Sequence, residues 1–405
     1  MILRFGDCEL DVAGRELRRG GIPIHVEPQV FDLLNYLIAH RERAVSKDEI
    51  VREVWRGRIV SEATLSSRIN AVRQAIGDTG KTQQYIRTLP RHGFRFVGEE
   101  ATGPKSLHSP ASLAASPAAV ERHVAPTQKV TFCRTRDGVN LAIATSGKGL
   151  PVIKTGTWLT NVERDWQSPL WAPLFSRLAS QFRLVRYDPR GCGLSDWDVP
   201  EISFDGFVSD LETVVDTLGL KRFALFGISQ GAAISIAYAA RHPERVSRLA
   251  LSGGFALGFR KRGSAAEIAA REALFTLIQH GWGQDNPAFR QVFDLRMWPE
   301  ATPTQMLSLN ELQRVSTSPE NAIRILRAIG DLDVVALLPQ ISVPTLVLHS
   351  RGDVTNPIEL GLTLARSIPR SRFVEIDSRS HIPLPHEPGW TRHVDELCAF
   401  LDDDT

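Results

Sequence analysis

One stretch, running from Phe223 to Ile234, constrains the fold of this 405-residue chain more than any other. In it an apolar run ends at Gly227, Ser229 lies between two glycines, and an alanine-rich run follows. This order predicts a strand, a sharp turn and a helix, with Gly-x-Ser-x-Gly at the turn. The glycines leave room for a strained backbone and for close packing of the helix on the strand. Such a turn holds the hydroxyl above the carboxyl edge of a parallel sheet, where ligands of open α/β sheets bind.

Length and composition predict two globular domains and no membrane span. A chain of 405 residues exceeds one ordinary domain, and no run of 18 apolar residues occurs in it. The first residues lack the basic and then apolar profile of a signal peptide. The cysteines do not have metal-ligand spacing, so we expect reduced thiols in a cytoplasmic protein that uses no metal or cofactor: Cys8, Cys133, Cys192 and Cys398.

The positive charge of the chain is concentrated near its N-terminus. The net charge is only +2, but the stretch from Arg52 to Arg95 holds nine basic and three acidic residues. That local excess is compatible with a surface for a polyanion. Charge alone favours a solvated basic face, so the interpretation depends on the fold.

The first 98 residues have the pattern of short strands, three helices and a hairpin. Strands are expected in residues 1–27, and apolar residues at helical spacing follow Pro28. Ser46–Glu49 is a capping box for a second helix, and Ser61–Thr64 can cap a third that ends at Gly77. Two strands around a turn at residues 90–93 complete a winged helix-turn-helix.

Residues 1–98 resemble the DNA-binding domain of the OmpR/PhoB response regulators and of CadC. The motifs that carry the resemblance are Phe5-Gly-Asp with Glu9-Leu-Asp, Arg15–Gly20, Val60–Asp78 and Ile86–Phe96. The resemblance implies a domain over residues 1–100 that binds double-stranded DNA, with its third helix in the major groove and its hairpin on the backbone and minor groove. It also implies a homodimer on repeated half-sites, and RNA polymerase is a further candidate partner.

The exposed side of the third helix then supplies the expected DNA contacts. Arg68 and Asn70 carry the donors that suit guanine and adenine edges. Other polar residues of this helix and of the hairpin are expected to contact DNA or to position the protein on its phosphates: Thr64, Ser67, Arg73, Arg87, Arg91 and His92. For each arginine, surface solubility is the alternative interpretation.

Residues 101–127 have the composition of a flexible linker. Fifteen of these 27 residues are Ala, Ser or Pro, and no apolar period is visible. We therefore expect the flanking domains to hold no fixed orientation.

From residue 128 onward, strand-like runs alternate with helix-like runs, which predicts a parallel sheet covered on both faces. Residues 128–402 resemble the α/β-hydrolase fold. The resemblance rests on Asp188-x-Arg-Gly-x-Gly-x-Ser195, Gly227-x-Ser-x-Gly231, Gly352-Asp353 and Ser380-His-x-Pro383. It implies a doubly wound, mostly parallel sheet in a domain over residues 128–405. The mostly helical residues 255–335 would be its cap, the part that sets ligand choice in this fold. Its basic stretches at residues 260–262 and 314–327 favour an anionic or polar ligand, with a solvated helix face as the alternative interpretation.

The same motifs predict a catalytic triad in the order that this fold requires. Ser229 would be the nucleophile, His381 its base, and Asp353 the group that orients and stabilises the imidazolium. The competing histidines are His349, His386 and His393.

A developing oxyanion needs fixed N–H donors, expected from the backbone of Gln230 and of Thr157, with Trp158 as the alternative to Thr157. Trp158 and Trp166 are candidates for the ligand pocket. The family usually has His-Gly where this chain has Thr155-Gly156, although a backbone donor after the glycine can survive that change.

Three interpretations follow from the two resemblances. The chain is a one-component transcription regulator that binds a small molecule, a serine hydrolase whose DNA-binding domain is secondary, or a hydrolase fold kept as a catalytically silent sensor. The complete triad favours a regulator that hydrolyses its ligand. Esters, lactones and C–C bonds in diketones are the candidate substrates, whereas a haloalkane dehalogenase would need Asp at position 229.

Overall fold

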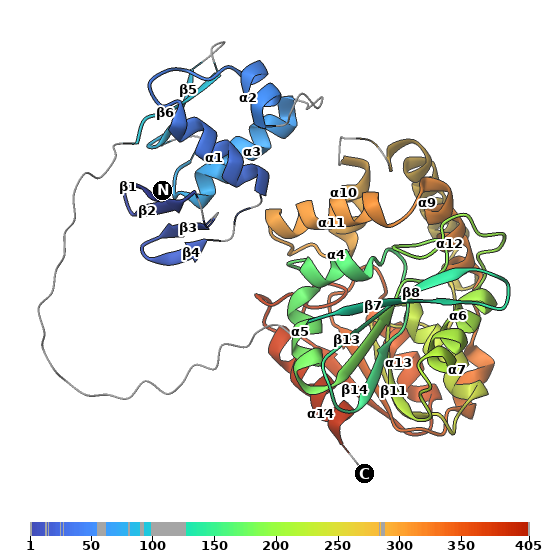
Figure 1. Ribbon diagram of the computed structural model, residues 1–405. Coiled ribbons are helices and arrows are strands. Elements are labelled where there is room, and N and C mark those ends of the chain that lie inside the picture. The colour runs from blue at the N-terminus through green and yellow to red at the C-terminus, as the bar shows by residue number, and fades with distance from the viewer. Residues whose placement is uncertain are drawn as a thin grey trace, which may run out of the picture. The chain divides into compact units, whose positions relative to one another are not determined.

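The computed structural model in Figure 1 describes residues 2–12, 14, 16–24, 26, 28–54, 62–79, 82–89, 93–98, 127–282, 284 and 288–403. The chain divides into two compact units, Met1–Ala118 and Ala119–Thr405. Of the stretch expected to be a linker, residues 101–126 lie outside the described residues.

The N-terminal unit begins with four short antiparallel strands in sequence order. They are β1 (Ile2–Phe5), β2 (Cys8–Asp11), β3 (Glu16–Arg19) and β4 (Ile22–Ile24). Three helices and a hairpin follow: α1 (Pro28–Ala39), α2 (Lys47–Val54), α3 (Glu62–Ala75), β5 (Ile86–Leu89) and β6 (Gly93–Phe96). This order of elements confirms the winged helix-turn-helix.

One apolar cluster joins these elements. The residues of α1 that recur at helical spacing are buried in it, together with Leu65, Ile69 and Val72 of α3. Before α2, Ser46 Oγ accepts the N–H of Glu49 at 3.2 Å, as a capping residue should. The carboxylate of Glu49 instead binds Tyr36 and Arg43, so this side chain links α2 to α1 and to the segment between them.

Asp78 fixes the connection between α3 and the hairpin. Its carboxylate accepts backbone N–H groups from Thr79, Gln84, Tyr85 and Ile86 at 2.7–2.9 Å. Burial raises the pKa of this carboxyl, but the four hydrogen bonds outweigh that effect and lower it to about 2. Asp78 is therefore ionised at neutral pH and sets the position of β5 after the end of α3.

The C-terminal unit is built on an eight-stranded sheet with the order β14-β13-β12-β11-β9-β10-β8-β7. Neighbouring strands from β14 to β10 are parallel, and β8 runs antiparallel to both β10 and β7. The fold class expected from the sequence is confirmed. The strands are β7 (Lys129–Arg134), β8 (Asn140–Ser146), β9 (Pro151–Lys154), β10 (Arg183–Tyr187), β11 (Phe223–Ile228), β12 (Val246–Ser252), β13 (Thr345–Ser350) and β14 (Ser371–Ile376).

Helices cover both faces of this sheet, and a separate apolar core lies under each layer. One layer contains α6 (Phe204–Thr217), α7 (Gln230–Arg241) and α13 (Ile358–Ser367). The other contains α5 (Ala172–Gln181) and α14 (Trp390–Asp402), visible beside each other in Figure 1. Neither α5 nor the short α4 (Val162–Gln167) before it was expected from the sequence.

A helical cap is inserted between β12 and β13. It contains α8 (Phe259–Arg262), α9 (Ala265–Gly281), α10 (Ala288–Met297), α11 (Pro303–Ser316) and α12 (Pro319–Asp331), and the 3₁₀ helix η1 (Val335–Gln340) leads back to the sheet. The two ends of the insertion pair with each other through an antiparallel bridge between Leu257 and Asp333. None of the helices in the described part of the chain combines the length and apolar character that a bilayer crossing requires.

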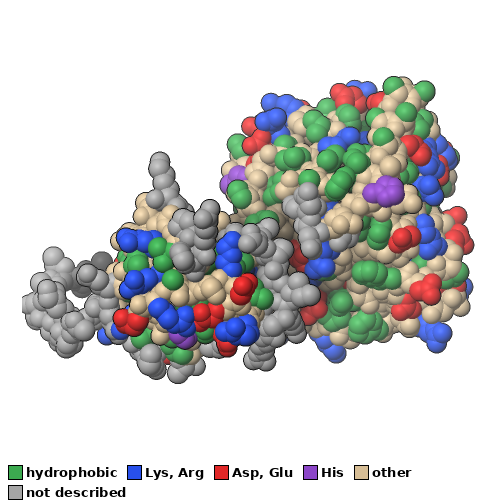
Figure 2. Space-filling view, turned by 90° about the horizontal axis from the view of Figure 1, so that it is seen from above, with side chains coloured by type: hydrophobic (Ala, Val, Ile, Leu, Met, Phe, Trp, Pro, Cys, Tyr) green, Lys and Arg blue, Asp and Glu red, His purple; other side chains and the backbone are tan. Residues whose placement is uncertain are grey.

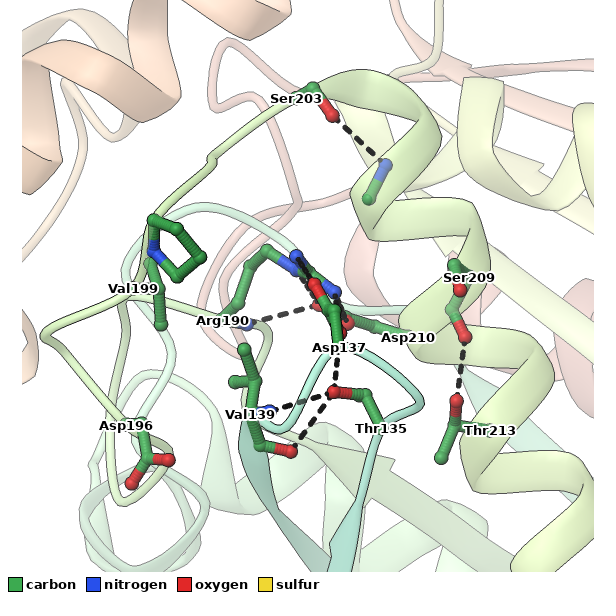
Figure 3. A network of polar contacts seen from close by, with 12 residues as sticks. Thr135, Asp137, Val139, Arg190, Asp196, Val199, Ser203, Ser209, Asp210 and Thr213 are labelled. Carbon is green, nitrogen blue, oxygen red and sulfur yellow. Dashed lines mark hydrogen bonds and ion pairs between the residues drawn. The ribbon is translucent and has the colours of Figure 1, made fainter.

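A buried ion-pair network holds the loop that follows β10. Figure 3 shows the guanidinium of Arg190 between Asp137 and Asp210, with an N–O distance of 2.7 Å to each carboxylate. Asp188 accepts the N–H groups of Val162 and Leu194 at 3.0 and 2.8 Å. The Asp188-x-Arg190 motif therefore acts as a brace for this loop.

Candidate active site and DNA-binding unit

Ser229 lies at the sharp turn between β11 and α7. Its backbone has φ 54° and ψ −124°, a conformation that residues other than glycine rarely adopt. Its N–H donates to Ser252 O on the neighbouring strand at 3.0 Å, which holds the turn against the sheet. Gly227 is required because a Cβ there would lie 2.6 Å from Gly231 O. The strand, turn and helix predicted from the sequence are all present.

His381 and Asp353 meet although 28 residues separate them. His381 lies in the loop after β14, and its Nδ1 is 2.6 Å from Oδ2 of Asp353, which follows β13. Oδ1 of Asp353 accepts the N–H groups of Thr355 and Asn356 at 2.8 and 3.0 Å. Burial would raise the pKa of Asp353, but the charge and hydrogen bond of His381 lower it below its ordinary value. The carboxylate is therefore charged and oriented.

The other ring nitrogen of His381, Nε2, takes no part in the contact with Asp353. Nε2 is buried, and within the described part of the chain it has no hydrogen-bond partner. Ser229, Gln230, Thr157 and His381 line the same cavity. The structure thus brings the predicted nucleophile, base and oxyanion residues to the wall of one cavity.

The three competing histidines make other contacts, although His349 Nε2 also lies 3.8 Å from Asp353 Oδ2. His349 is buried, its Nε2 lies 2.7 Å from Asn356 O, and burial lowers its pKa. His393 Nε2 lies 2.9 Å from Ser252 Oγ, and His386 Nε2 lies 2.9 Å from Glu300 O. None of the three lines the cavity.

The segment after β9 departs from the family pattern, and the structure shows what replaces it. Thr155 Oγ1 lies 2.5 Å from Ser235 Oγ, so this threonine ties the end of β9 to α7. The buried ammonium group of Lys154 donates to Thr157 Oγ1 at 2.8 Å. Burial lowers the pKa of Lys154 to about 8. Gln230 is the first residue of α7, where a backbone N–H has no partner within the helix.

The cavity is mostly apolar and has a volume of about 1190 Å³, its opening to solvent included. Trp158 lines it, as expected, and so do Trp171 and Trp298. The expectation for Trp166 was wrong. This side chain is not among the lining residues, because it packs over the guanidinium of Arg186, 5.3 Å from the ring centre.

The cap was expected from the sequence to contribute to ligand choice, but most of its residues that line this cavity were not named. Arg271, Asp294, Arg296 and Gln313 line it from α9, α10 and α11, and Arg262 lines it from the end of α8. Of the two basic stretches expected to favour an anionic or polar ligand, residues 260–262 contribute Arg262 to the lining, and no arginine of residues 314–327 lines the cavity. Among the described residues, no group of three His, Cys, Asp or Glu side chains is arranged to hold a metal ion.

Three of the expected DNA contacts have accessible side chains. Arg68 is half-buried and Asn70 is exposed on α3, and Arg87 is exposed on β5. Thr64 and Ser67 belong to α3, but their side chains are outside the described part, as are Arg91 and His92. Figure 2 shows Lys and Arg side chains close together on one face of the N-terminal unit, with Asp and Glu among them.

The expectation for Arg73 was wrong. Only 5% of this residue is exposed, and its Nη2 donates to Ile86 O and Thr88 Oγ1 on β5, both at 2.9 Å. Its guanidinium therefore joins the third helix to the hairpin and does not lie on the outer face of α3. The basic character of the residue concealed this inward orientation in the sequence.

Comparison with known families agrees with both halves of the structure. Residues 164–388, more than half of the chain, match the α/β hydrolase fold family, so the chain belongs to that family. Residues 21–96 match a second family, described as the C-terminal domain of transcriptional regulatory proteins. The OmpR/PhoB-type DNA-binding domain expected from the sequence is thereby confirmed.

Individual relatives resemble the hydrolase unit. The AB hydrolase superfamily protein YisY of Bacillus subtilis is 28% identical over 257 residues, which cover 62% of this chain and 91% of YisY. The putative carbamate hydrolase RutD of Agrobacterium fabrum is 27% identical over 227 residues, covering 55% and 84%. An esterase structure from Exiguobacterium antarcticum superposes with a TM-score of 0.58 at 24% identity, covering 67% of this chain and 99% of the esterase.

Proposed function

We propose that this protein is a one-component transcription regulator whose hydrolase domain binds and hydrolyses a small ester or lactone. In this proposal Ser229 is the nucleophile, His381 the general base and Asp353 the residue that orients it. Turnover would remove the ligand that adjusts DNA binding.

One observation carries the proposal. Ser229 and His381 line one cavity, the Nδ1 side of His381 is held by Asp353 at 2.6 Å, and its buried Nε2 has no partner among the described residues. A silent sensor would not need a strained serine and an oriented histidine on the wall of one cavity, since strain of this kind costs about 1–3 kcal/mol.

The proposed reaction follows from these positions. Oγ of Ser229 attacks the carbonyl carbon while Nε2 of His381 takes its proton, and the carbonyl electron pair moves onto oxygen. The N–H groups of Gln230 and Thr157 stabilise that oxyanion. The intermediate collapses, the alcohol leaves with the proton from His381, and an acyl-serine remains. Water then attacks with the same assistance, releasing the acid and restoring the hydroxyl of Ser229.

RutD is named as a putative carbamate hydrolase. Carbamates, esters and lactones share an acyl carbon bonded to an oxygen leaving group, so one nucleophile and one oxyanion site serve all three. This shared chemistry supports a substrate with an activated carbonyl group.

Regulation adds one requirement. The ligand must bind the two regulatory states of the protein with different affinities, because a ligand shifts an equilibrium only by its differential affinity. The double-stranded DNA partner would be bound through α3, with Arg68 and Asn70 contacting base edges. We further propose a homodimer on repeated half-sites and a cytoplasmic location.

The test is labelling of the purified full-length protein with a fluorophosphonate probe, which modifies activated serines. The wild type should be labelled, whereas Ser229→Ala and His381→Ala should not. Ser180→Ala and His386→Ala are matched controls, since both residues are exposed and lie outside the cavity, and both should be labelled like the wild type. Active protein would then be screened for turnover of esters and lactones, and for release from promoter DNA.

A folded wild-type protein that resists the probe would contradict hydrolysis and favour the sensor. Labelling that persists in Ser229→Ala would show that another residue is the nucleophile.

A further inference from the structure

Three guanidinium groups line the same cavity as Ser229. Arg262 ends α8, Arg271 lies on α9 and Arg296 lies on α10, so each comes from a different helix of the cap. All three residues are partly buried. The rest of the cavity wall is mostly aromatic and aliphatic, which makes these charges its principal polar feature.

The contacts that hold these groups do not neutralise them. Arg262 donates to Leu257 O and lies over the ring of Phe255, 4.8 Å from its centre. Arg271 donates to Thr355 O at 3.0 Å and lies 5.3 Å from the centre of the Phe259 ring. Within the described part of the chain, no carboxylate lies within ion-pair distance of Arg262, Arg271 or Arg296.

The neighbouring basic residues that do not line the cavity behave differently. Arg260 pairs with Glu272 at 2.5 Å and Asp331 at 3.1 Å, and Lys261 lies 3.6 Å from Asp333. Of three consecutive basic residues, the two that do not line the cavity have acidic partners, and the one that lines it has none among the described residues. Within this run, ion pairing is therefore limited to the residues that do not line the cavity.

The acidic residues near these three arginines do not pair with them either. Glu267 is exposed and caps α9 through Ser264. Asp353 is engaged by His381. Asp294 also lines the cavity, but burial raises its pKa to about 8, so it is mostly protonated at neutral pH.

Burial and repulsion make this arrangement costly without an anion. Burial, followed by the charge of Arg271, lowers the pKa of Arg262 to about 10, and burial followed by the charge of Arg296 lowers that of Arg271. Partly buried like charges without partners destabilise a fold. An anionic ligand would offset that cost, and guanidinium groups match carboxylate and phosphate oxygens in a fork geometry.

We propose that Arg262, Arg271 and Arg296 form an anion-binding subsite, and that the ligand of this cavity carries a carboxylate or phosphate group in addition to its reactive carbonyl. The inference deepens the proposed function, because it names the substrate class of the same cavity. Apolar walls would hold the carbon chain between the anionic group and the carbonyl at Ser229.

Binding can be tested without turnover. The full-length Ser229→Ala protein would be titrated by calorimetry with monomethyl adipate, pentyl phosphate and the neutral ester methyl hexanoate. Monomethyl adipate and methyl hexanoate differ only in a terminal carboxylate in place of a methyl group. We expect one of the anions to bind at least roughly tenfold more tightly than the neutral ester. The tighter of the two would identify the anionic group.

The arginines are then changed one at a time in the Ser229→Ala background. Arg262→Gln and Arg271→Gln should each remove most of the preference, and Arg271→Lys should restore part of it. Arg260→Gln is the matched control, because it removes a cation of the same short helix that is paired at the surface. It should leave the preference unchanged. Circular dichroism of each variant would verify folding.

The outcomes separate this inference from the proposed function. Equal binding of all three compounds, or a preference that survives both glutamine variants, would overturn the anion site even if the wild type hydrolyses neutral esters. An arginine-dependent preference in a protein that hydrolyses nothing would support the anion site and contradict hydrolysis.

Discussion

Nδ1 of His381 lies 2.6 Å from Oδ2 of Asp353, and this contact joins the loops after two neighbouring parallel strands, β13 and β14. Because Nδ1 is engaged, Nε2 is the imidazole nitrogen that has no partner among the described residues. The proposed role of Asp353 can therefore be tested separately from that of Ser229.

Asp353→Asn should lower kcat by about ten-thousand-fold, because an amide can stabilise the wrong tautomer of His381 and cannot stabilise its cation. Steady-state hydrolysis of an ester found active would measure the change. The control is Asp377→Asn, an exposed aspartate after β14 that should keep full activity. Near-normal turnover in Asp353→Asn would remove this residue from the catalytic mechanism.

Gly253→Ala should abolish activity in a folded protein. Gly253 has φ 58°, and a Cβ at this position would lie 2.6 Å from Cε1 of His381, so the imidazole must move. Gly219→Ala is the control, since Gly219 has φ 63° but nothing within 4 Å of its added Cβ.

Both glycine variants should lose about 1 kcal/mol of stability from backbone strain, and only Gly253→Ala should lose turnover. Urea unfolding and ester hydrolysis would be measured on both. Equal activity in the two variants would show that the contact with His381 is unimportant.

Arg68→Ala should weaken binding to a specific operator by roughly 1–3 kcal/mol if the side chain contacts a base edge. Fluorescence anisotropy with the native promoter and with a scrambled duplex would separate specific from general binding. Arg18→Ala is a suitable control, because Arg18 is exposed on β3 and paired with Glu16. Unchanged affinity for the promoter would exclude Arg68 from base contact.

Arg73→Met should destabilise the N-terminal unit by about 2 kcal/mol, since it removes two hydrogen bonds of a buried charged group and leaves Ile86 O without that donor. Hydrogen exchange followed by mass spectrometry should show faster exchange in peptides from α3 and β5 in the full chain. Peptides from the hydrolase unit provide the internal control. Unchanged exchange together with weaker DNA binding would indicate a direct DNA contact instead.

Stability should fall in mild acid because of His393. Burial lowers the pKa of His393 to about 4, whereas an unfolded histidine has a pKa of about 6.5. Between these values the unfolded chain binds more protons, so the free energy of unfolding decreases as pH falls from about 6.5 to 4, by about 3 kcal/mol in total. His393→Gln should flatten this dependence in urea titrations, and the exposed His386→Gln should not. Parallel curves for wild type and His393→Gln would contradict the assignment.

Local sequence patterns predicted both folds because each element carried its own signal. Apolar spacing in α1 marked the buried face of a helix, and the glycines around Ser229 marked a turn that few other residues permit. The triad could be named because motif order is tied to strand order in this fold.

Side-chain direction was not predictable in the same way. Arg73 and Arg262 are both basic residues in basic stretches, yet both turn inward, and only tertiary contacts decide this. The expectation for Trp166 was wrong for the same reason, because its ring packs on the guanidinium of Arg186 and does not line the cavity. Helix α5 was missed although Pro173 near its start and the helical spacing of its buried residues are signals that the sequence carries.

The way the cap is attached has a consequence for how such proteins diverge. Its ends pair with each other through Leu257 and Asp333, and two main-chain carbonyls of the cap accept hydrogen bonds from the loops that carry His381 and Asp353. His381 N–H donates to Met297 O at 2.7 Å, and Thr355 Oγ1 donates to Arg296 O at 2.8 Å. Main-chain carbonyls persist whatever side chains a gene encodes. Substitutions of cap side chains can therefore change the wall of the cavity without removing these two carbonyl acceptors.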